Sequence, residues 1–221
     1  MRNAGRMARG RGGCIWLFCA GRALSARRIP QPDLSGFVKF FHQMMSSLTH
    51  LAPSPWVMQQ ALLWPKDGRV LDFASGRGRH SRLLAGRFHI LAVDRDADAL
   101  TPLAAHPQID ICLCDLEADA AWPFAGEKFD AVLVTNYLFR PKLGALFDLV
   151  AEGGYLAYET FAVGHATFGR PKNPDFLLHE GELAAALPAE FDIIDAFHGV
   201  ISAPRPAVIQ RLAARRQIQP T

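Results

Sequence analysis

Gly76 and Gly78 lie in a short loop between an acid, Asp72, and a stretch with helical spacing. Glycine lacks a Cβ atom, so the backbone at these positions can adopt unusual φ/ψ values and approach a ligand closely. A helix that begins at residue 79 would direct its free N–H groups toward whatever the loop holds. We therefore interpret residues 70–81 as the end of the first strand, the ligand loop and the start of the first helix of a nucleotide-binding α/β domain.

The elements that must position this loop are short apolar runs that alternate with helical patterns. Each of the three runs after the loop ends before a polar residue, namely Asp94, Asp115 or Asn136. Open α/β sheets bind ligands at the carboxyl ends of their strands, so these side chains are expected to meet at one edge. The predicted elements here are strands over residues 69–73, 89–93, 109–114 and 131–135, with a helix over 79–85.

Two ligand classes use such a loop. A dinucleotide fingerprint has three glycines, G-x-G-x-x-G, directly after the strand. Here Ala74 stands at the first glycine position and Ser81 at the third, and Asp72 precedes the loop. A carboxylate at that place suits a cationic ligand better than a pyrophosphate. An NAD(P)-dependent oxidoreductase stays open as an alternative, as does a non-catalytic scaffold that keeps the cofactor pocket.

The D-x-A-x-G-x-G pattern at residues 72–78 resembles motif I of the class I S-adenosylmethionine-dependent methyltransferases, in a variant with alanine at the first glycine position. Residues 158–161 and 169–178 look like the matching stretch of small bacterial methyltransferases of the tellurite-resistance type. The resemblance implies a Rossmann-like α/β fold: a doubly wound, mostly parallel, seven-stranded sheet with helices on both faces. It also implies S-adenosylmethionine as cofactor and methyl transfer to an unidentified acceptor, expected to be a small molecule.

The resemblance places Asp72 near the amino group of the cofactor's methionine moiety and Asp115 near the adenine. Asp94 lies 18 residues after Gly76, close to the offset of roughly 20 at which an acid reaches a ribose hydroxyl in this architecture. The cofactor-binding residues expected on this basis are Asp72, Ala74, Ser75, Gly76, Gly78, His80, Asp94, Arg95, Asp115, Leu116 and Asn136. No metal site is expected.

Methyl transfer requires mainly positioning and the exclusion of water, so no obligatory catalytic triad is expected. The candidate catalytic residues follow the fourth and fifth predicted strands and are Tyr137, Glu159, His165 and Arg170. A buried Glu159 needs a partner, for which Arg170 is the candidate; the two side chains could equally only fix the loop. His165 could act as a general base, and His80 could either line the cofactor pocket or be hydrogen-bonded within the core.

Further patterns complete the predicted domain. Phe37, Phe40, Phe41 and Met44 form the apolar stripe of an amphipathic helix over residues 36–45. Ser54 and Pro55 are typical of a helix start ahead of residues 56–63. Beyond the fourth strand we predict helices over 141–150 and 182–187, a turn at Gly153 and Gly154, and strands over 155–160, 191–196 and 207–213.

The first 32 residues hold seven arginines and no acid, whereas the other 189 carry 17 basic against 21 acidic residues, a net charge of −4. We expect residues 1–32 to be a disordered basic leader, with a targeting leader, a tail or an upstream start as alternatives. Residues 33–66 are expected to form a helical segment, 67–215 the methyltransferase domain and 216–221 a tail. The acidic domain argues against a nucleic-acid partner, and the lack of a 20-residue apolar run argues against a membrane partner. A cytoplasmic location is expected, and the oligomeric state is left open.

Overall fold

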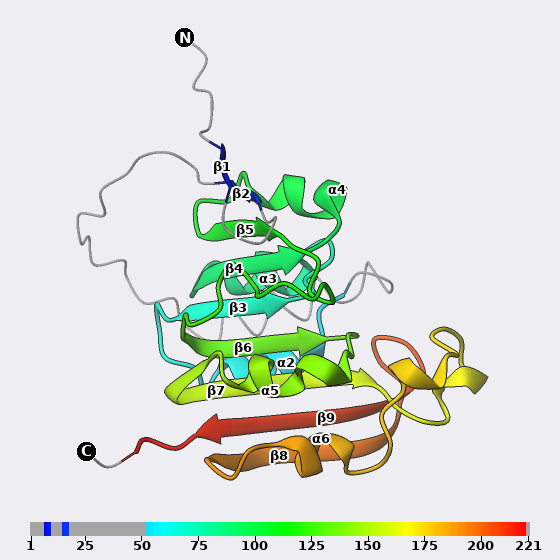
Figure 1. The fold of residues 1–221 in the computed structure, drawn as a ribbon. Coiled ribbons are helices and arrows are strands. Elements are labelled where there is room, and N and C mark those ends of the chain that lie inside the picture. Colours follow the sequence, from blue (N-terminus) through cyan, green and yellow to red (C-terminus); the bar gives the residue numbers. More distant parts are fainter. Residues whose placement is uncertain (1–6, 10–14, 18–51, 220–221) are drawn as a thin grey trace.

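The structure, a computed structural model, describes residues 7–9, 15–17 and 52–219. One sheet runs through these residues, with helices on both of its faces (Figure 1). Its strands are β1 (Met7–Arg9), β2 (Ile15–Leu17), β3 (Arg69–Phe73), β4 (His89–Asp94), β5 (Ile109–Leu113), β6 (Phe129–Thr135), β7 (Val150–Phe161), β8 (Phe191–Ile201) and β9 (Ala207–Arg216). The helices are α2 (Pro55–Ala61), α3 (Arg79–Leu84), α4 (Ala97–Leu100), α5 (Leu143–Phe147) and α6 (Glu182–Ala186), and a 3-10 turn, η3 (His165–Thr167), follows β7. The predicted helix over 36–45 lies outside the described residues.

The order of strands in the sheet is β1-β2-β5-β4-β3-β6-β7-β9-β8. Neighbours from β5 to β7 are parallel, and β9 is antiparallel to both β7 and β8. The expected Rossmann-like, mostly parallel sheet is therefore confirmed for the seven strands from β3 to β9. The short strands β1 and β2 add an antiparallel pair at the β5 edge. The chain order reverses at β3, which lies between β4 and β6, and a crevice for a ligand forms at such a switch point.

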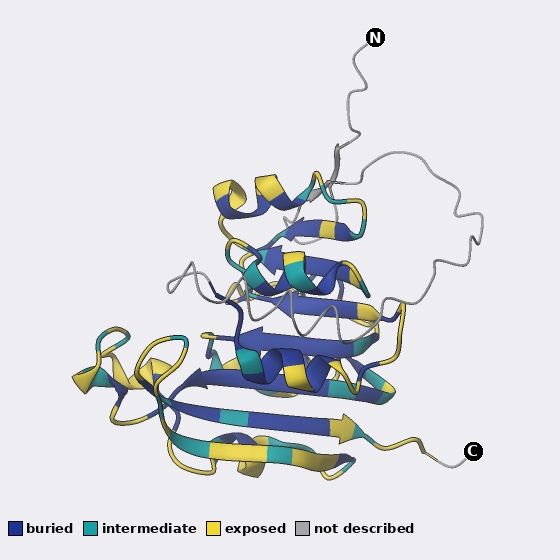
Figure 2. Ribbon diagram, turned by 180° about the vertical axis from the view of Figure 1, so that it is seen from behind, coloured by how far each residue is buried: buried dark blue, intermediate teal, exposed yellow. Residues whose placement is uncertain are grey.

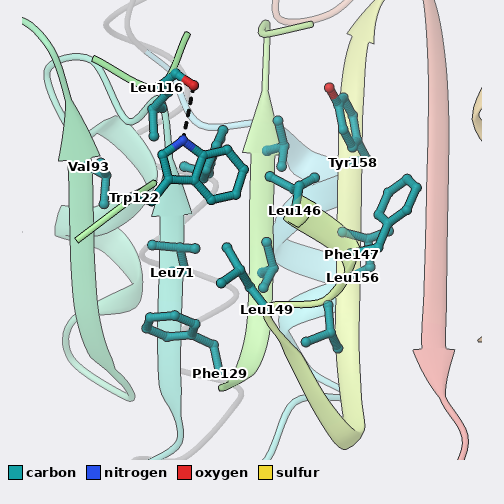
Figure 3. Close-up of a cluster of buried hydrophobic side chains, with 14 of the residues drawn as sticks. Leu71, Val93, Leu116, Trp122, Phe129, Leu146, Phe147, Leu149, Leu156 and Tyr158 are labelled. Atoms are coloured by element: carbon teal, nitrogen blue, oxygen red, sulfur yellow. Dashed lines mark hydrogen bonds between the residues drawn. The ribbon is translucent and has the colours of Figure 1, made fainter. Parts of the chain in front are cut away.

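Alternation of side chains along the strands builds one hydrophobic core on each face of the sheet. Val70 belongs to the same core as buried residues of α2, α3 and α4, whereas Leu71 belongs to the core that contains buried residues of α5 and α6. Strand interiors are accordingly buried, while β8 at the edge is largely exposed (Figure 2). On the α5 face, Trp122 donates its indole N–H to the Leu116 carbonyl at 3.0 Å (Figure 3), which fixes the chain that follows β5 beside the core.

The largest differences from the predicted elements concern β7 and the helix before it. The predicted helix over 141–150 is reduced to α5, and β7 begins at Val150 because its backbone pairs with Phe129. Gly153 and Gly154, predicted as a turn, lie inside β7, where the pairing register with β6 shifts. Gly153 has a φ of 72°, which accommodates that irregularity. In addition, β8 extends beyond the predicted residue 196 to Ile201.

Candidate functional site

The carboxyl ends of β3, β4 and β5 surround a cavity of about 120 Å³. It brings together residues that are distant in sequence but were expected to share a site. Its lining comprises Ala74, Asp94, Arg95, Cys114, Asp115, Leu116, Glu117 and Tyr137. Five of these were predicted to bind the cofactor, and Tyr137 was predicted to face the acceptor. Cys114 and Glu117 were not predicted, although both are adjacent to predicted residues.

The glycine loop has a backbone with positive φ values, a conformation that residues other than glycine rarely adopt. Ala74, Gly76 and Gly78 have φ values of 56°, 54° and 66°. A Cβ at Gly78 would lie 2.5 Å from Leu103 Cδ1. A Cβ at Gly76 would have no atom of the described residues within 4 Å, so among these residues the position is open toward a ligand. Gly78 therefore permits close packing within the protein, and Gly76 keeps the loop surface clear.

Asp94 holds this loop in place. Its Oδ2 accepts the Gly76 N–H at 2.7 Å, and its Oδ1 accepts the Asp96 N–H at 3.0 Å. Asp94 is half-buried at the cavity wall, where a carboxylate can also accept hydroxyl hydrogen bonds. The arrangement suits a ribose, as expected from the spacing to Gly76.

Asp72 presents an unsatisfied acceptor beneath the loop. The side chain is only 1% exposed; its Oδ2 accepts from the N–H of Ser81 at 3.1 Å and from its hydroxyl at 2.5 Å. Its Oδ1 is buried and has no partner among the described residues. Burial raises the pKa of the carboxyl group from its ordinary 3.8 to about 6. A buried acceptor without a donor fits the ammonium group of an amino-acid ligand.

His80 was predicted as either a pocket residue or a core residue, and both of its ring nitrogens contact protein. Nε2 accepts the Ser54 backbone N–H at 3.0 Å, and Nδ1 lies 3.5 Å from the Thr135 hydroxyl. Burial lowers the pKa of His80 well below its ordinary value, so the ring is neutral. His80 thus links α3 to the segment before α2. Its contact with a cofactor stays a prediction.

Tyr137 follows β6 and borders the cavity. Its ring lies edge-on to Phe73, with 5.5 Å between centroids, and its backbone carbonyl accepts the Tyr158 hydroxyl at 2.8 Å. The Tyr137 hydroxyl is buried without a partner in the described part of the chain, and burial raises its pKa. The preceding Asn136 has a φ of 57° and donates its N–H to the Glu159 carbonyl at 2.9 Å. These contacts turn the chain at the sheet edge and leave a neutral phenol facing the cavity.

The expected pairing of Glu159 with Arg170 is wrong. Glu159 Oε2 accepts from Arg211 Nε at 2.6 Å and from the Ser54 hydroxyl at 3.0 Å. Glu159 and Arg211 are directly opposite in the antiparallel β7–β9 ladder, so they share a face of the sheet. Arg170 is exposed in the loop after β7.

His165, the candidate general base, is buried, with 2% exposure. Its Nε2 lies 3.0 Å from the Arg170 carbonyl oxygen. A carbonyl only accepts hydrogen bonds, so Nε2 carries the proton in the neutral ring and Nδ1 carries a lone pair. Nδ1 has no partner among the residues that the structure describes. The ring stacks on Phe161 at 4.2 Å, which holds this basic nitrogen in a fixed place beyond the end of β7.

Comparison with known proteins agrees with this geometry. Residues 70–154 match the family described as Methyltransferase domain, a segment that extends from β3 into β7. Residues 70–154 therefore carry the sequence pattern of a methyltransferase domain, within a sheet that has the class I methyltransferase fold. S-adenosylmethionine is the cofactor of this class. Two features of the described residues fit it: the buried Asp72 Oδ1 without a partner, and the open space at Gly76. No curated protein sequence matches the chain.

Solved structures with the fold of this methyltransferase domain include TehB from Haemophilus influenzae, with a TM-score of 0.61 and 17% identity over 75% of this chain. The match spans 63% of the TehB chain. The 1,6-didemethyltoxoflavin-N1-methyltransferase of Burkholderia thailandensis, whose structure holds S-adenosylhomocysteine, has a TM-score of 0.56 and 18% identity over 96% of this chain and 99% of that one. The N-methyltransferase NodS from Bradyrhizobium japonicum has a TM-score of 0.54 and 14% identity, covering 85% and 100%. These identities establish a shared fold.

Proposed function

We propose that the protein transfers a methyl group from S-adenosylmethionine to a small-molecule acceptor. The observation that carries this proposal is the buried Asp72 Oδ1, which has no partner among the described residues, beneath a glycine loop whose neighbouring cavity is lined by Asp94 and Asp115. This set of groups is complementary to an ammonium, a ribose and an adenine in turn. The match of residues 70–154 to the Methyltransferase domain family supports the same reading.

When bound, S-adenosylmethionine supplies a methyl group on a sulfonium sulfur, which leaves with the C–S bonding pair as a thioether. The chain's own contribution is to position and to desolvate. In this proposal Asp72 receives the ammonium, Asp94 the ribose hydroxyls and Asp115 the adenine, and Leu116 and Ala74 lie along an apolar edge of the adenine. The remaining predicted cofactor residues, Arg95, Ser75 and Asn136, lie at the same strand ends.

The acceptor side is proposed to lie beyond the carboxyl ends of β6 and β7. His165 is the candidate general base there, because the Nδ1 lone pair is unpartnered among the described residues and its ring is fixed by stacking. Glu159 is a positioning residue, since Arg211 and Ser54 both bind its Oε2. Arg170 acts through its backbone carbonyl, which fixes the His165 tautomer.

The partner and the location are inferred from charge and composition. Residues 33–221 carry a net charge of −4, which disfavours a nucleic-acid substrate and supports a small-molecule acceptor. No helix of the described ranges is long and apolar enough to cross a membrane. We infer a cytoplasmic location from this composition.

The test is isothermal titration of the full chain with S-adenosylmethionine, S-adenosylhomocysteine and NADH in parallel. We expect micromolar binding of the first two and no heat from NADH. Binding of NADH alone would overturn the cofactor assignment. Binding without methyl transfer to any member of a broad acceptor panel would favour a scaffold that keeps the pocket.

A further inference from the structure

The hydroxyl group of Tyr137 is a buried polar group beside the cavity at the carboxyl ends of β3, β4 and β5. Tyr137 is one of the residues that line this cavity. Its hydroxyl oxygen is buried, and no atom of the described residues forms a hydrogen bond with it. A buried hydroxyl without a hydrogen bond is unfavourable in an apolar environment. Such a group in a native fold is therefore a candidate for binding a ligand.

The ring and the backbone of Tyr137 are both fixed by contacts. The ring packs edge-on against Phe73 with 5.5 Å between centroids, and Phe73 in turn contacts the rings of Trp122 and Phe124 at 5.2 and 6.4 Å. The backbone carbonyl of Tyr137 accepts the hydroxyl of the fully buried Tyr158 at 2.8 Å. Turning the Tyr137 hydroxyl toward another protein group would disturb this packing. The hydroxyl is therefore held at a fixed place, as selective binding of a ligand requires.

The cavity that Tyr137 borders is the size of one ring system rather than of a whole cofactor. Its volume is about 120 Å³, whereas pockets for complete ligands of drug size occupy roughly 300 to 1,000 Å³. Ala74 and Leu116 contribute apolar side chains to its lining. Asp94 and Asp115 contribute carboxylates. Apolar walls with carboxylates beside them suit a flat base that carries an exocyclic amine.

Tyr137 supplies a hydrogen-bond donor that the carboxylates of the cavity cannot supply. A carboxylate only accepts hydrogen bonds, so Asp115 can bind the amine of an adenine but not its ring nitrogens, which are acceptors themselves. Burial raises the pKa of Tyr137, and the nearby acids Glu117 and Asp115 raise it further, so the hydroxyl keeps its proton. Among the other side-chain donors of the lining, Arg95 is exposed to water and the Cys114 thiol is only a weak donor. The buried hydroxyl is therefore the side-chain donor that best suits a ring nitrogen.

On the basis of the methyltransferase function proposed above, we propose that Tyr137 belongs to the cofactor side of the site and donates a hydrogen bond to a ring nitrogen of the cofactor's adenine. The hydroxyl then selects the base through an acceptor atom, whereas Asp115 selects it through the amine. This role differs from the contact with the methyl acceptor that the position of Tyr137 after the fourth predicted strand indicates. A hydroxyl that binds the ligand and no protein group contributes to affinity alone, so its removal leaves the protein without ligand as stable as before.

The experiment compares the wild type with Tyr137→Phe, which removes only the hydroxyl oxygen. Calorimetry measures the affinity of the full chain for S-adenosylhomocysteine and for its 1-deaza, 3-deaza and 7-deaza adenine analogues, each of which lacks one ring nitrogen. Tyr137→Phe should bind S-adenosylhomocysteine about tenfold more weakly than the wild type does. One analogue should lose about tenfold in the wild type and then bind both proteins equally, because it lacks the nitrogen that the hydroxyl binds. Tyr155→Phe is the matched control and should change no affinity, since Tyr155 lies in β7 outside the cavity lining.

Each other outcome overturns the proposal in a recognisable way. Equal affinity of the wild type and Tyr137→Phe for S-adenosylhomocysteine would show that the hydroxyl does not bind the cofactor. An equal loss in Tyr137→Phe for all three analogues would show that the hydroxyl does not bind a ring nitrogen. A lower melting temperature of Tyr137→Phe without ligand would assign the hydroxyl to the fold. Failure of the wild-type chain to bind S-adenosylhomocysteine at all would instead refute the proposed function.

Discussion

Replacing Asp72 with asparagine should stabilise the protein without ligand while weakening its affinity for the cofactor. A pKa of about 6 in place of 3.8 corresponds to about 3 kcal/mol. Between pH 3.8 and about pH 6 the folded chain binds more protons than the unfolded chain. The free energy of unfolding therefore falls as the pH rises through this range, and it stays lower above about pH 6. Asp72→Asn removes the charge, so at pH 7.5 it should be more stable by up to about 3 kcal/mol.

For a chain of this size, that difference raises the melting temperature by up to about 6 to 12 °C. The gain should disappear at pH 4, where the wild-type carboxyl is largely protonated when folded. The same variant loses a charged hydrogen bond to the ligand ammonium, which weakens S-adenosylhomocysteine binding about 10- to 150-fold. Thermal unfolding from pH 4 to 8 and titration calorimetry measure both effects.

The control is Asp119→Asn, since Asp119 is exposed after β5 and should change neither quantity. Calorimetry of the wild type in buffers of different ionisation enthalpy gives an independent check. Because ligand binding should lower the pKa of Asp72, about half a proton per ligand should be released at pH 6. A variant that is less stable than wild type at pH 7.5, or that binds S-adenosylhomocysteine equally well, would refute the reasoning.

Three further substitutions test other parts of the site. Asp94→Asn should weaken S-adenosylhomocysteine binding, measured by calorimetry, about 10- to 100-fold because charged hydrogen bonds to the ribose are lost. The melting temperature should change little. An unchanged affinity would contradict the ribose assignment. Glu159→Gln should lower the free energy of unfolding, measured in urea, by about 3 kcal/mol because it breaks a shielded ion pair. The control is Glu127→Gln: Glu127 and its partner Arg69 are 37% and 55% exposed, so this change should cost under about 1 kcal/mol. Equal losses in the two variants would contradict the burial argument. Gly78→Ala should destabilise the fold by more than about 1 to 2 kcal/mol, because backbone strain at a positive φ combines with a clash against Leu103. Gly76→Ala should mainly reduce ligand affinity. A larger loss of stability in Gly76→Ala than in Gly78→Ala would contradict the assigned roles.

The central strands were predictable because each is a short, largely apolar run. The predicted limits of β3 match the structure at both ends, and the acids at the carboxyl ends of β4 and β5 meet at one cavity as expected. The length of β7 was not predictable in this way. A pair of glycines is typical of a turn, and only the neighbouring strand β6 shows that the backbone continues through them with a shift of register.

The partner of Glu159 was missed because it depends on tertiary pairing. Arg211 is 52 residues away along the chain, and nothing in the local pattern connects the two. The signal that could have found it is the antiparallel register of β7 and β9, which places these residues directly opposite each other. The sequence shows that a buried glutamate needs a cation. It does not show which of several nearby arginines lies across the ladder.

The two halves of the site are joined through Ser54, in the segment before α2. Its N–H donates to His80 in α3, and its hydroxyl donates to Glu159 in β7. The link requires a neutral His80, because a protonated ring has no acceptor nitrogen. Since burial holds the pKa of His80 well below its ordinary value, the link persists through the pH range in which Asp72 titrates. A change in cofactor affinity near pH 6 should therefore report on Asp72, and Asp72→Asn should abolish that pH dependence. If the dependence persisted in Asp72→Asn, another titrating group would have to account for it.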